Sequence, residues 1–154
     1  MNDSTAAPPA PSPFRRATTL DALNASSRGT AMEPLGIVFT EIGHDFLRAT
    51  MPVDARTHQP YGLLHGGASA LLAETLGSTA GMLCVEEGRG CVGIEINANH
   101  LRGVRSGTVT GTARPLHVGR STQVWEIRIE DAAGHLVCVS RLTLAVVPLP
   151  AAAR

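Results

Sequence analysis

Lysine is absent from this 154-residue sequence, and all 13 of its basic residues are arginine. The absence excludes a lysine that forms a Schiff base, the lysine of a phosphate-binding P-loop and an S-x-x-K nucleophile. Arginine leaves the recognition of phosphate or carboxylate open, because its planar guanidinium can form two parallel hydrogen bonds with either group.

Aromatic residues are scarce, at 3%, and the formal net charge is zero. We therefore expect no nucleic-acid partner, because there is no basic excess to neutralise phosphates and few rings to stack on bases. The three cysteines and six histidines show no metal-type spacing. The sequence thus predicts no metal site, and we expect no cofactor.

Signals for export or membrane insertion are also missing. The first 16 residues contain no apolar run of the kind that forms a signal peptide. The three cysteines are an odd number and lie in apolar runs, as expected for buried free thiols in a reducing compartment. We therefore expect a cytoplasmic protein. Residues 62–85 are apolar and long enough to span a membrane, but Glu74 and His65 would be costly in lipid. No membrane partner is expected.

The length and the 44% apolar content predict one domain with one core. Prolines and small residues predict a disordered tail over residues 1–17, before a domain at 18–148 and a short tail at 149–154. We expect a helix at 18–29 with a capping box from Thr18 to Asp21, and a long helix at 66–84. Alternating apolar residues predict strands at 35–43, 46–53, 90–102, 107–119, 121–131 and 135–147.

This order of elements predicts an α+β fold in which one antiparallel sheet is wrapped around one long central helix. The strand count leaves no second layer to cover the face of the helix that points away from the sheet. We therefore expect a second copy of the chain to supply that cover.

Glu74 is the only formally charged residue between Thr57 and Val85, with histidine counted as neutral. At 100° per residue it points away from the leucine face of the predicted helix, so it could be an ordinary solvated residue. A solvated helix face normally carries several charges, whereas the neighbours of Glu74 on this face are small residues. The pattern favours a carboxylate that serves a binding or catalytic site.

Gly66 and Gly67 begin the same helix, and their backbone N–H groups have no partners within it. Such groups carry the positive end of the helix dipole and can stabilise a developing oxyanion. Gln59 and His65 lie in the preceding loop and can orient a carbonyl group or a water molecule. Gly66 and Glu74 are eight residues apart, or ~12 Å along one helix. One site that uses both residues therefore needs two chains.

The stretches "QPYGLLHGGASALLAETLGS", "GIEINANHLR", "GTARPLHVGRSTQVWEIRI" and "GHLVCVSRLTLAVV" resemble the hotdog-fold acyl-CoA thioesterases over residues 19–147. The nearest branch is that of 4-hydroxybenzoyl-CoA thioesterase and 1,4-dihydroxy-2-naphthoyl-CoA hydrolase. The resemblance implies hydrolysis of an acyl-CoA thioester with an aromatic acyl group, by a homodimer or a homotetramer built from two dimers.

The resemblance also implies residue roles. Glu74 would be the nucleophile or the general base for water, and the Gly66 N–H would polarise the thioester carbonyl. Gln59 would position water or the leaving group, His65 would support the carbonyl site, and Ser78 would hold water for the second step.

Coenzyme A carries phosphates, and several polar residues near strand ends are candidates to bind them: His100, Arg102, His117, Gly119 and Arg120. Each of these residues could equally be an ordinary solvated turn residue. Two other functions stay open, namely a hydratase or dehydratase acting on acyl-CoA or acyl carrier protein, and a non-catalytic acyl-CoA binding module.

Overall fold

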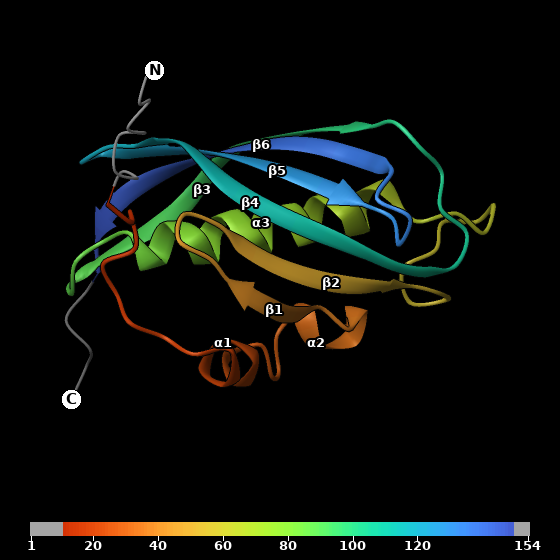
Figure 1. The fold of residues 1–154 in the computed structure, drawn as a ribbon, viewed down its shortest axis with the longest axis horizontal. Coiled ribbons are helices and arrows are strands. Elements are labelled where there is room, and N and C mark those ends of the chain that lie inside the picture. Colours follow the sequence, from red (N-terminus) through yellow and green to blue (C-terminus); the bar gives the residue numbers. More distant parts are fainter. Residues whose placement is uncertain (1–10, 150–154) are drawn as a thin grey trace, which may run out of the picture.

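The computed structural model describes residues 11–149, which form a six-stranded antiparallel sheet curled around one long helix (Figure 1). The strands lie in the order β1-β2-β4-β5-β6-β3. In chain order the elements are α1 (Leu20–Ser26), α2 (Met32–Leu35), β1 (Val38–Ile42), β2 (Leu47–Val53), α3 (Gly66–Leu83), β3 (Arg89–His100), β4 (Gly107–Val118), β5 (Thr122–Glu130) and β6 (Leu136–Pro148). The predicted fold class is confirmed.

Helix α3 packs one apolar face onto the concave side of the sheet. Leu72, Ala73 and Leu76 have no exposed surface. The helix approaches the sheet closely, since a Cβ added at Gly77 would lie 2.6 Å from a methyl group of Leu142 on β6. Small residues on this face thus allow the backbone of α3 to lie near the strands, and the contact buries the apolar side chains of both.

Every second side chain of the strands points inward and forms the sheet side of the core. In β2 every second residue from Leu47 to Val53 is buried. In β5 Trp125, Ile127 and Ile129 have no exposed surface, while the residues between them reach the outer face. Successive side chains of a strand point to opposite faces, so this pattern predicted the strands correctly. All six predicted strands are present, with shifted ends.

The predicted first helix is shorter than expected, and its cap differs. Helix α1 begins after Thr19, whose hydroxyl accepts the N–H of Ala22 at 3.2 Å. The prediction that Thr18 is the cap is therefore wrong by one residue. The short helix α2 was not predicted; it contains Pro34, a residue that is unfavourable inside most helices.

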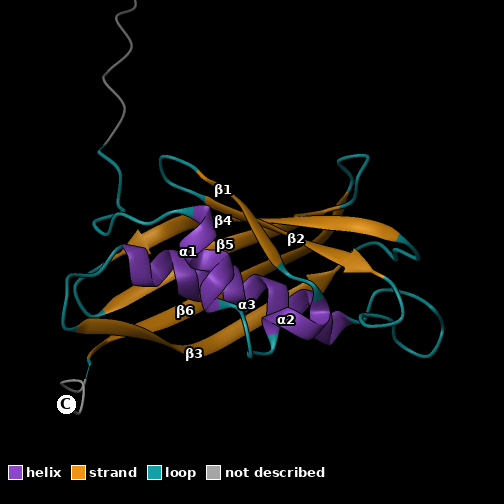
Figure 2. Cartoon of the chain, turned by 90° about the horizontal axis from the view of Figure 1, so that it is seen from below, coloured by secondary structure: helices purple, strands orange, loops and turns teal. Residues whose placement is uncertain are grey.

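Both short helices lie on the same side of the sheet as α3 (Figure 2). Helix α2 contacts α3, so part of the face of α3 that points away from the sheet is already covered by the same chain. The expectation that a second copy must provide all of this cover is therefore too strong. No helix within residues 11–149 has the length and hydropathy needed to cross a membrane.

The N-terminal segment packs against the domain earlier than the predicted boundary at residue 18. Phe14 stacks on Trp125 with ring centroids 6.5 Å apart. The backbone N–H groups of Arg15 and Arg16 both donate to the carbonyl of Leu83, at 2.8 and 3.1 Å, at the end of α3. Residues 11–17 of the predicted tail thus belong to the packed domain, and residues 1–10 and 150–154 lie outside the described residues.

Candidate active site

The first turn of α3 presents one unused backbone donor. His65 is the N-cap residue, and its Nδ1 accepts the N–H of Gly67 at 2.8 Å. The N–H of Gly66, by contrast, has no hydrogen-bond partner within residues 11–149. Of the two glycines predicted to offer free donors, only Gly66 does so, because the side chain of His65 satisfies the other. His65 therefore has a structural role at this site.

The loop before α3 is held by backbone hydrogen bonds at both of its ends. The N–H of His65 donates to the carbonyl of Thr57 at 2.8 Å, and that of Leu64 to Val104 at 2.7 Å. Within the loop the side-chain oxygen of Gln59 accepts the N–H of Tyr61. This bond occupies the amide oxygen of Gln59 and leaves its NH₂ group as a donor.

A pocket of about 330 Å³ brings four of the predicted site residues together. Gly66 and Gln59 line it from the helix start and its loop. His100 lines it from the end of β3, and Arg102 from the segment that follows this strand. Gly66 lies directly against His100, since a Cβ added at Gly66 would be 2.8 Å from Nε2 of His100. The pocket thus combines a free N–H donor with an imidazole and a guanidinium, a set suited to binding an oxyanion.

Glu74 lies outside this pocket, in a separate groove between α2 and α3. The groove has a volume of about 580 Å³, and Ser78 lines it one turn after Glu74. The exposed carboxylate of Glu74 makes no hydrogen bond or ion pair with any residue in the range 11–149. Its Oε1 lies against β3, where a Cβ added at Gly93 would be only 2.8 Å away.

The groove contains no other charged group besides Glu74. Its walls combine apolar side chains with hydroxyl groups, contributed by Thr30, Ala31, Met32, Gly67, Ala70, Leu71, Thr75, Ser78 and Thr79. A cation that would neutralise the carboxylate is thus missing from these walls. The arrangement suits a neutral ligand that has both an apolar surface and polar substituents.

One chain does not assemble Gly66 and Glu74 into one reaction centre. Both residues are on α3, ~12 Å apart along the helix axis, and they line different cavities. The structure therefore leaves each half of the predicted site open to solvent.

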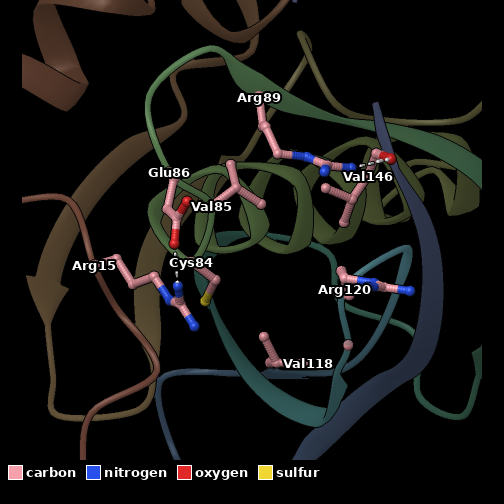
Figure 3. A pocket seen from close by; sticks show the side chains of 9 residues that line it. Arg15, Cys84, Val85, Glu86, Arg89, Val118, Arg120 and Val146 are labelled. Atoms are coloured by element: carbon pink, nitrogen blue, oxygen red, sulfur yellow. Dashed lines mark hydrogen bonds and ion pairs between the residues drawn. The ribbon is translucent and has the colours of Figure 1, made fainter. Parts of the chain in front are cut away.

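The five residues predicted to bind coenzyme A fall into two groups. His100 and Arg102 are beside Gly66. His117 instead lies near the end of β4, and Gly119 and Arg120 follow in the turn to β5, where they line a cavity at the other end of α3 (Figure 3). A single chain therefore does not bring the five residues into one binding surface.

None of the three cysteines lines the Gly66 pocket or the Glu74 groove. All three are free, and Cys84 and Cys138 are buried. Burial raises the pKa of the Cys84 thiol to about 12, so the thiol stays protonated and is a poor nucleophile at neutral pH. No cluster of potential metal ligands occurs among the described residues.

Two features of the site were missed in the sequence. The segment of Thr30, Ala31 and Met32 lies far from Glu74 in sequence, and no local pattern links the two. Gly93 did carry a signal, since an isolated glycine within a strand indicates a bulge or a close approach. The register of β3 on β6 does shift between Gly93 and Glu95, and the glycine lies against the carboxylate.

The sequence of residues 61–138 matches the thioesterase superfamily. Together with the fold and with relatives at well above 50% identity, this shows that the chain belongs to that family of thioester hydrolases. A proofreading thioesterase, EntH of Cronobacter sakazakii, is 59% identical over 86% of this chain and 97% of its own length. The 1,4-dihydroxy-2-naphthoyl-CoA hydrolase of Escherichia coli is 56% identical over 86% of this chain and 98% of its own.

Solved structures agree with this assignment. A thioesterase from Haemophilus influenzae superposes with a TM-score of 0.88 at 52% identity, over 92% of this chain and 99% of that one. A thioesterase from Staphylococcus aureus, 35% identical over 76% of this chain and 98% of its own with a TM-score of 0.74, was solved with a glutamine replaced by alanine. The same protein was also solved with a glutamate replaced, 15 positions after that glutamine. Gln59 and Glu74 have the same separation.

Proposed function

We propose that this chain hydrolyses an acyl-CoA thioester to the free acid and coenzyme A. The observation that carries the proposal is the unpaired carboxylate of Glu74 in a groove without other charges, on the same helix as the free N–H of Gly66. The relatives named as a proofreading thioesterase and as a hydrolase of 1,4-dihydroxy-2-naphthoyl-CoA support this substrate class.

The reaction centre is completed by two subunits. The N–H of Gly66 in one subunit donates to the thioester carbonyl oxygen and stabilises the negative charge that develops on it. The carboxylate of Glu74 from the other subunit acts on the carbonyl carbon. Gln59, whose NH₂ group is free to donate, positions water or the departing sulfur, and Ser78 holds the water of the second step beside Glu74.

The free edge of β3 is the surface where the second copy joins. This strand ends the sheet, and Val92 and Ile94 on it are 48% and 61% exposed. An unpaired edge with exposed apolar residues is a template for another strand. Gly66 lies against His100, and Glu74 lies against Gly93. Antiparallel pairing of two β3 strands, with Gly93 of one near His100 of the other, would thus bring Glu74 to Gly66.

Two chemical routes are compatible with this geometry. In the first, a Glu74 oxygen attacks the carbonyl carbon, the C–S bond breaks, the thiolate leaves, and water then hydrolyses the mixed anhydride. In the second, Glu74 removes a proton from water, which attacks the carbonyl directly. A single turnover in ¹⁸O water distinguishes them. Label in Glu74 indicates an anhydride that water opens at the Glu74 carbonyl carbon, and label in the first-turnover acid without label in Glu74 excludes that course of the reaction.

The acyl group that fits the groove best is an aromatic one. Met32 and Leu71 provide apolar walls for a flat ring, and the hydroxyls of Thr75 and Thr79 can pair with ring substituents. A panel of naphthoyl-, benzoyl-, phenylacetyl- and medium-chain acyl-CoA substrates tests this choice. The proposal predicts the highest kcat/KM with a hydroxylated aroyl group, and a clear preference for medium chains would refute it.

Two other functions make different predictions for the same protein. A hydratase would convert an enoyl-CoA into a 3-hydroxyacyl product without releasing free thiol. A non-catalytic binding module would bind acyl-CoA but release no thiol. Thiol release that depends on Glu74 supports hydrolysis, and hydrolysis unchanged by Glu74→Ala would overturn the assignment.

A further inference from the structure

His100 ends β3, and its imidazole points its Nε2 tip at the first residue of α3. A Cβ added at Gly66 would lie 2.8 Å from Nε2 of His100, and 3.1 and 3.2 Å from the two ring carbons bonded to that nitrogen. No other atom lies nearer to this position, so the tip of the ring, rather than its face, is directed at Gly66. The side chain is exposed at the end of the strand, and the pocket beside Gly66 is open to it.

Three polar groups around this pocket have no partner in the described part of the chain. The N–H of Gly66 is one of them, and the imidazole of His100 makes no hydrogen bond or ion pair with residues 11–149. Ser69 lines the same pocket with only 2% of its surface exposed, and within this range its hydroxyl group is also unpaired. Polar groups that are largely buried normally have partners, so their arrangement here indicates that the pocket takes a polar group of a ligand.

The N–H of Gly66 and Nε2 of His100 are close enough to bind the same atom. A backbone nitrogen lies ~2.5 Å from the Cβ of its own residue, so the nitrogen of Gly66 is at most ~5.3 Å from Nε2 of His100. Two donors that are each ~2.9 Å from a shared acceptor can lie up to ~5.8 Å apart. One oxygen atom can therefore accept from both, with His100 in the tautomer that carries its proton on Nε2.

His65, which the sequence suggested as support for the carbonyl site, is not placed for this task. It does not line the pocket, and its Nδ1 accepts the N–H of Gly67 at the helix cap. His100 lines the pocket and has an unpaired ring. Of these two histidines, His100 is thus the one whose imidazole lies beside the free N–H of Gly66.

We propose that His100 is a further catalytic residue, which donates a hydrogen bond from Nε2 to the thioester carbonyl oxygen beside the N–H of Gly66. When the carbonyl carbon is attacked, the C=O double bond opens and negative charge develops on the oxygen, where both donors stabilise it. The double bond forms again as the C–S bond breaks, and His100 keeps its proton throughout. This role rests on the hydrolytic function proposed above.

Substitutions of His100 test the donor and its position. His100→Met removes the donor. His100→Gln places an amide nitrogen at the same number of bonds from Cα as Nε2, whereas His100→Asn places it one bond short. We expect His100→Met and His100→Asn to lower kcat roughly 100-fold, the usual effect of losing one oxyanion donor, and His100→Gln to recover most of that loss. The control His44→Met replaces an exposed histidine in the turn between β1 and β2 and should keep wild-type kcat. Thermal melts establish that every variant is folded.

Two substrates with the same acyl group separate this role from the binding of a coenzyme A phosphate. Benzoyl-N-acetylcysteamine has the thioester of benzoyl-coenzyme A but no phosphate. A carbonyl donor affects both, so His100→Met should lower kcat/KM by the same factor for the two substrates, whereas loss of a phosphate contact would affect only the coenzyme A thioester.

The proposal is overturned if His100→Met keeps wild-type kcat, if its effect is confined to KM for the coenzyme A thioester, or if His100→Asn is as active as His100→Gln. A wild-type protein that releases no thiol from any acyl-CoA would instead refute the proposed hydrolysis itself.

Discussion

Gly93→Ala tests whether the position of the Glu74 carboxylate, rather than its mere presence, determines activity. The added Cβ would lie 2.8 Å from Oε1 of Glu74, and ordinary contacts begin at 3.4 Å. The carboxylate must therefore retreat by about 0.6 Å or rotate away from β3. A displacement of this size at a reacting group reduces the rate roughly 10-fold to 100-fold.

The same substitution should leave the fold intact. The atom in the way is the end of a flexible side chain, and Gly93 has no positive φ that would strain an alanine. Alanine also restricts the unfolded chain, which stabilises a compatible site by about 0.4–1 kcal/mol. The melting temperature should thus stay the same or rise slightly while kcat/KM falls.

Gly111→Ala is the matched control, because it adds the same methyl group to a strand glycine that faces α3. Its Cβ would lie 2.6 Å from a methyl group of Leu76, a fully buried core residue. Overpacking at such a site costs about 1–3 kcal/mol, and Glu74 is not touched. Thiol release from an acyl-CoA and urea unfolding are measured for both variants. Full activity in Gly93→Ala, or lost activity together with lost stability, would refute the reasoning.

Three further outcomes follow from the site and its surroundings. Glu74→Gln should reduce hydrolysis roughly a thousandfold or more, because it removes the carboxylate that acts as nucleophile or base. The melting temperature should stay the same, because this carboxylate has no partner within residues 11–149, and a shift of several degrees would contradict this. His65→Ala should lower the free energy of unfolding by about 0.5–2 kcal/mol through loss of the helix cap, and His65→Asn should restore it in urea titrations. Burial raises the pKa of the Cys84 thiol from 9.0 to about 12, so as the pH rises above 9 the thiol ionises in the unfolded chain while it is still protonated in the folded protein. The free energy of unfolding should therefore fall above pH 9, and Cys84→Ala should make this decrease less steep.

The sequence predicted the parts of the fold that depend on local pattern. Period-two alternation placed all six strands, and the glycine turn with the apolar run placed α3 from Gly66 to Leu83. Helix α2 was missed because its four residues are too few for a periodic pattern and include Pro34. The packing of Phe14 on Trp125 was missed because a long-range contact leaves no trace in a proline-rich segment.

The site was predictable where the chemistry is local to α3. The sequence identified Glu74 because no other charged residue lies between Thr57 and Val85, and it identified Gly66 because this glycine begins the helix. Which glycine keeps a free N–H could not be read from the sequence, because it depends on the rotamer of His65. The two groups of predicted phosphate-binding residues could not be separated either, since turns far apart in space look alike in sequence.

Mixing two inactive variants tests the central claim, that Glu74 and Gly66 of different subunits form one site. Gly66→Pro removes the N–H at the first position of α3, where proline is tolerated, and the extended backbone of His65 suits a following proline. Gly66→Ala is its control, because it brings a similar Cβ towards His100 but keeps the N–H.

Glu74→Ala and Gly66→Pro are each expected to be nearly inactive alone. After unfolding and joint refolding in equal amounts, half of the dimers are mixed, and each mixed dimer contains one intact site. Activity should therefore return to roughly a quarter of the wild-type value. Mixtures that stay as inactive as the separate variants, although mixed dimers have formed, would contradict the shared site.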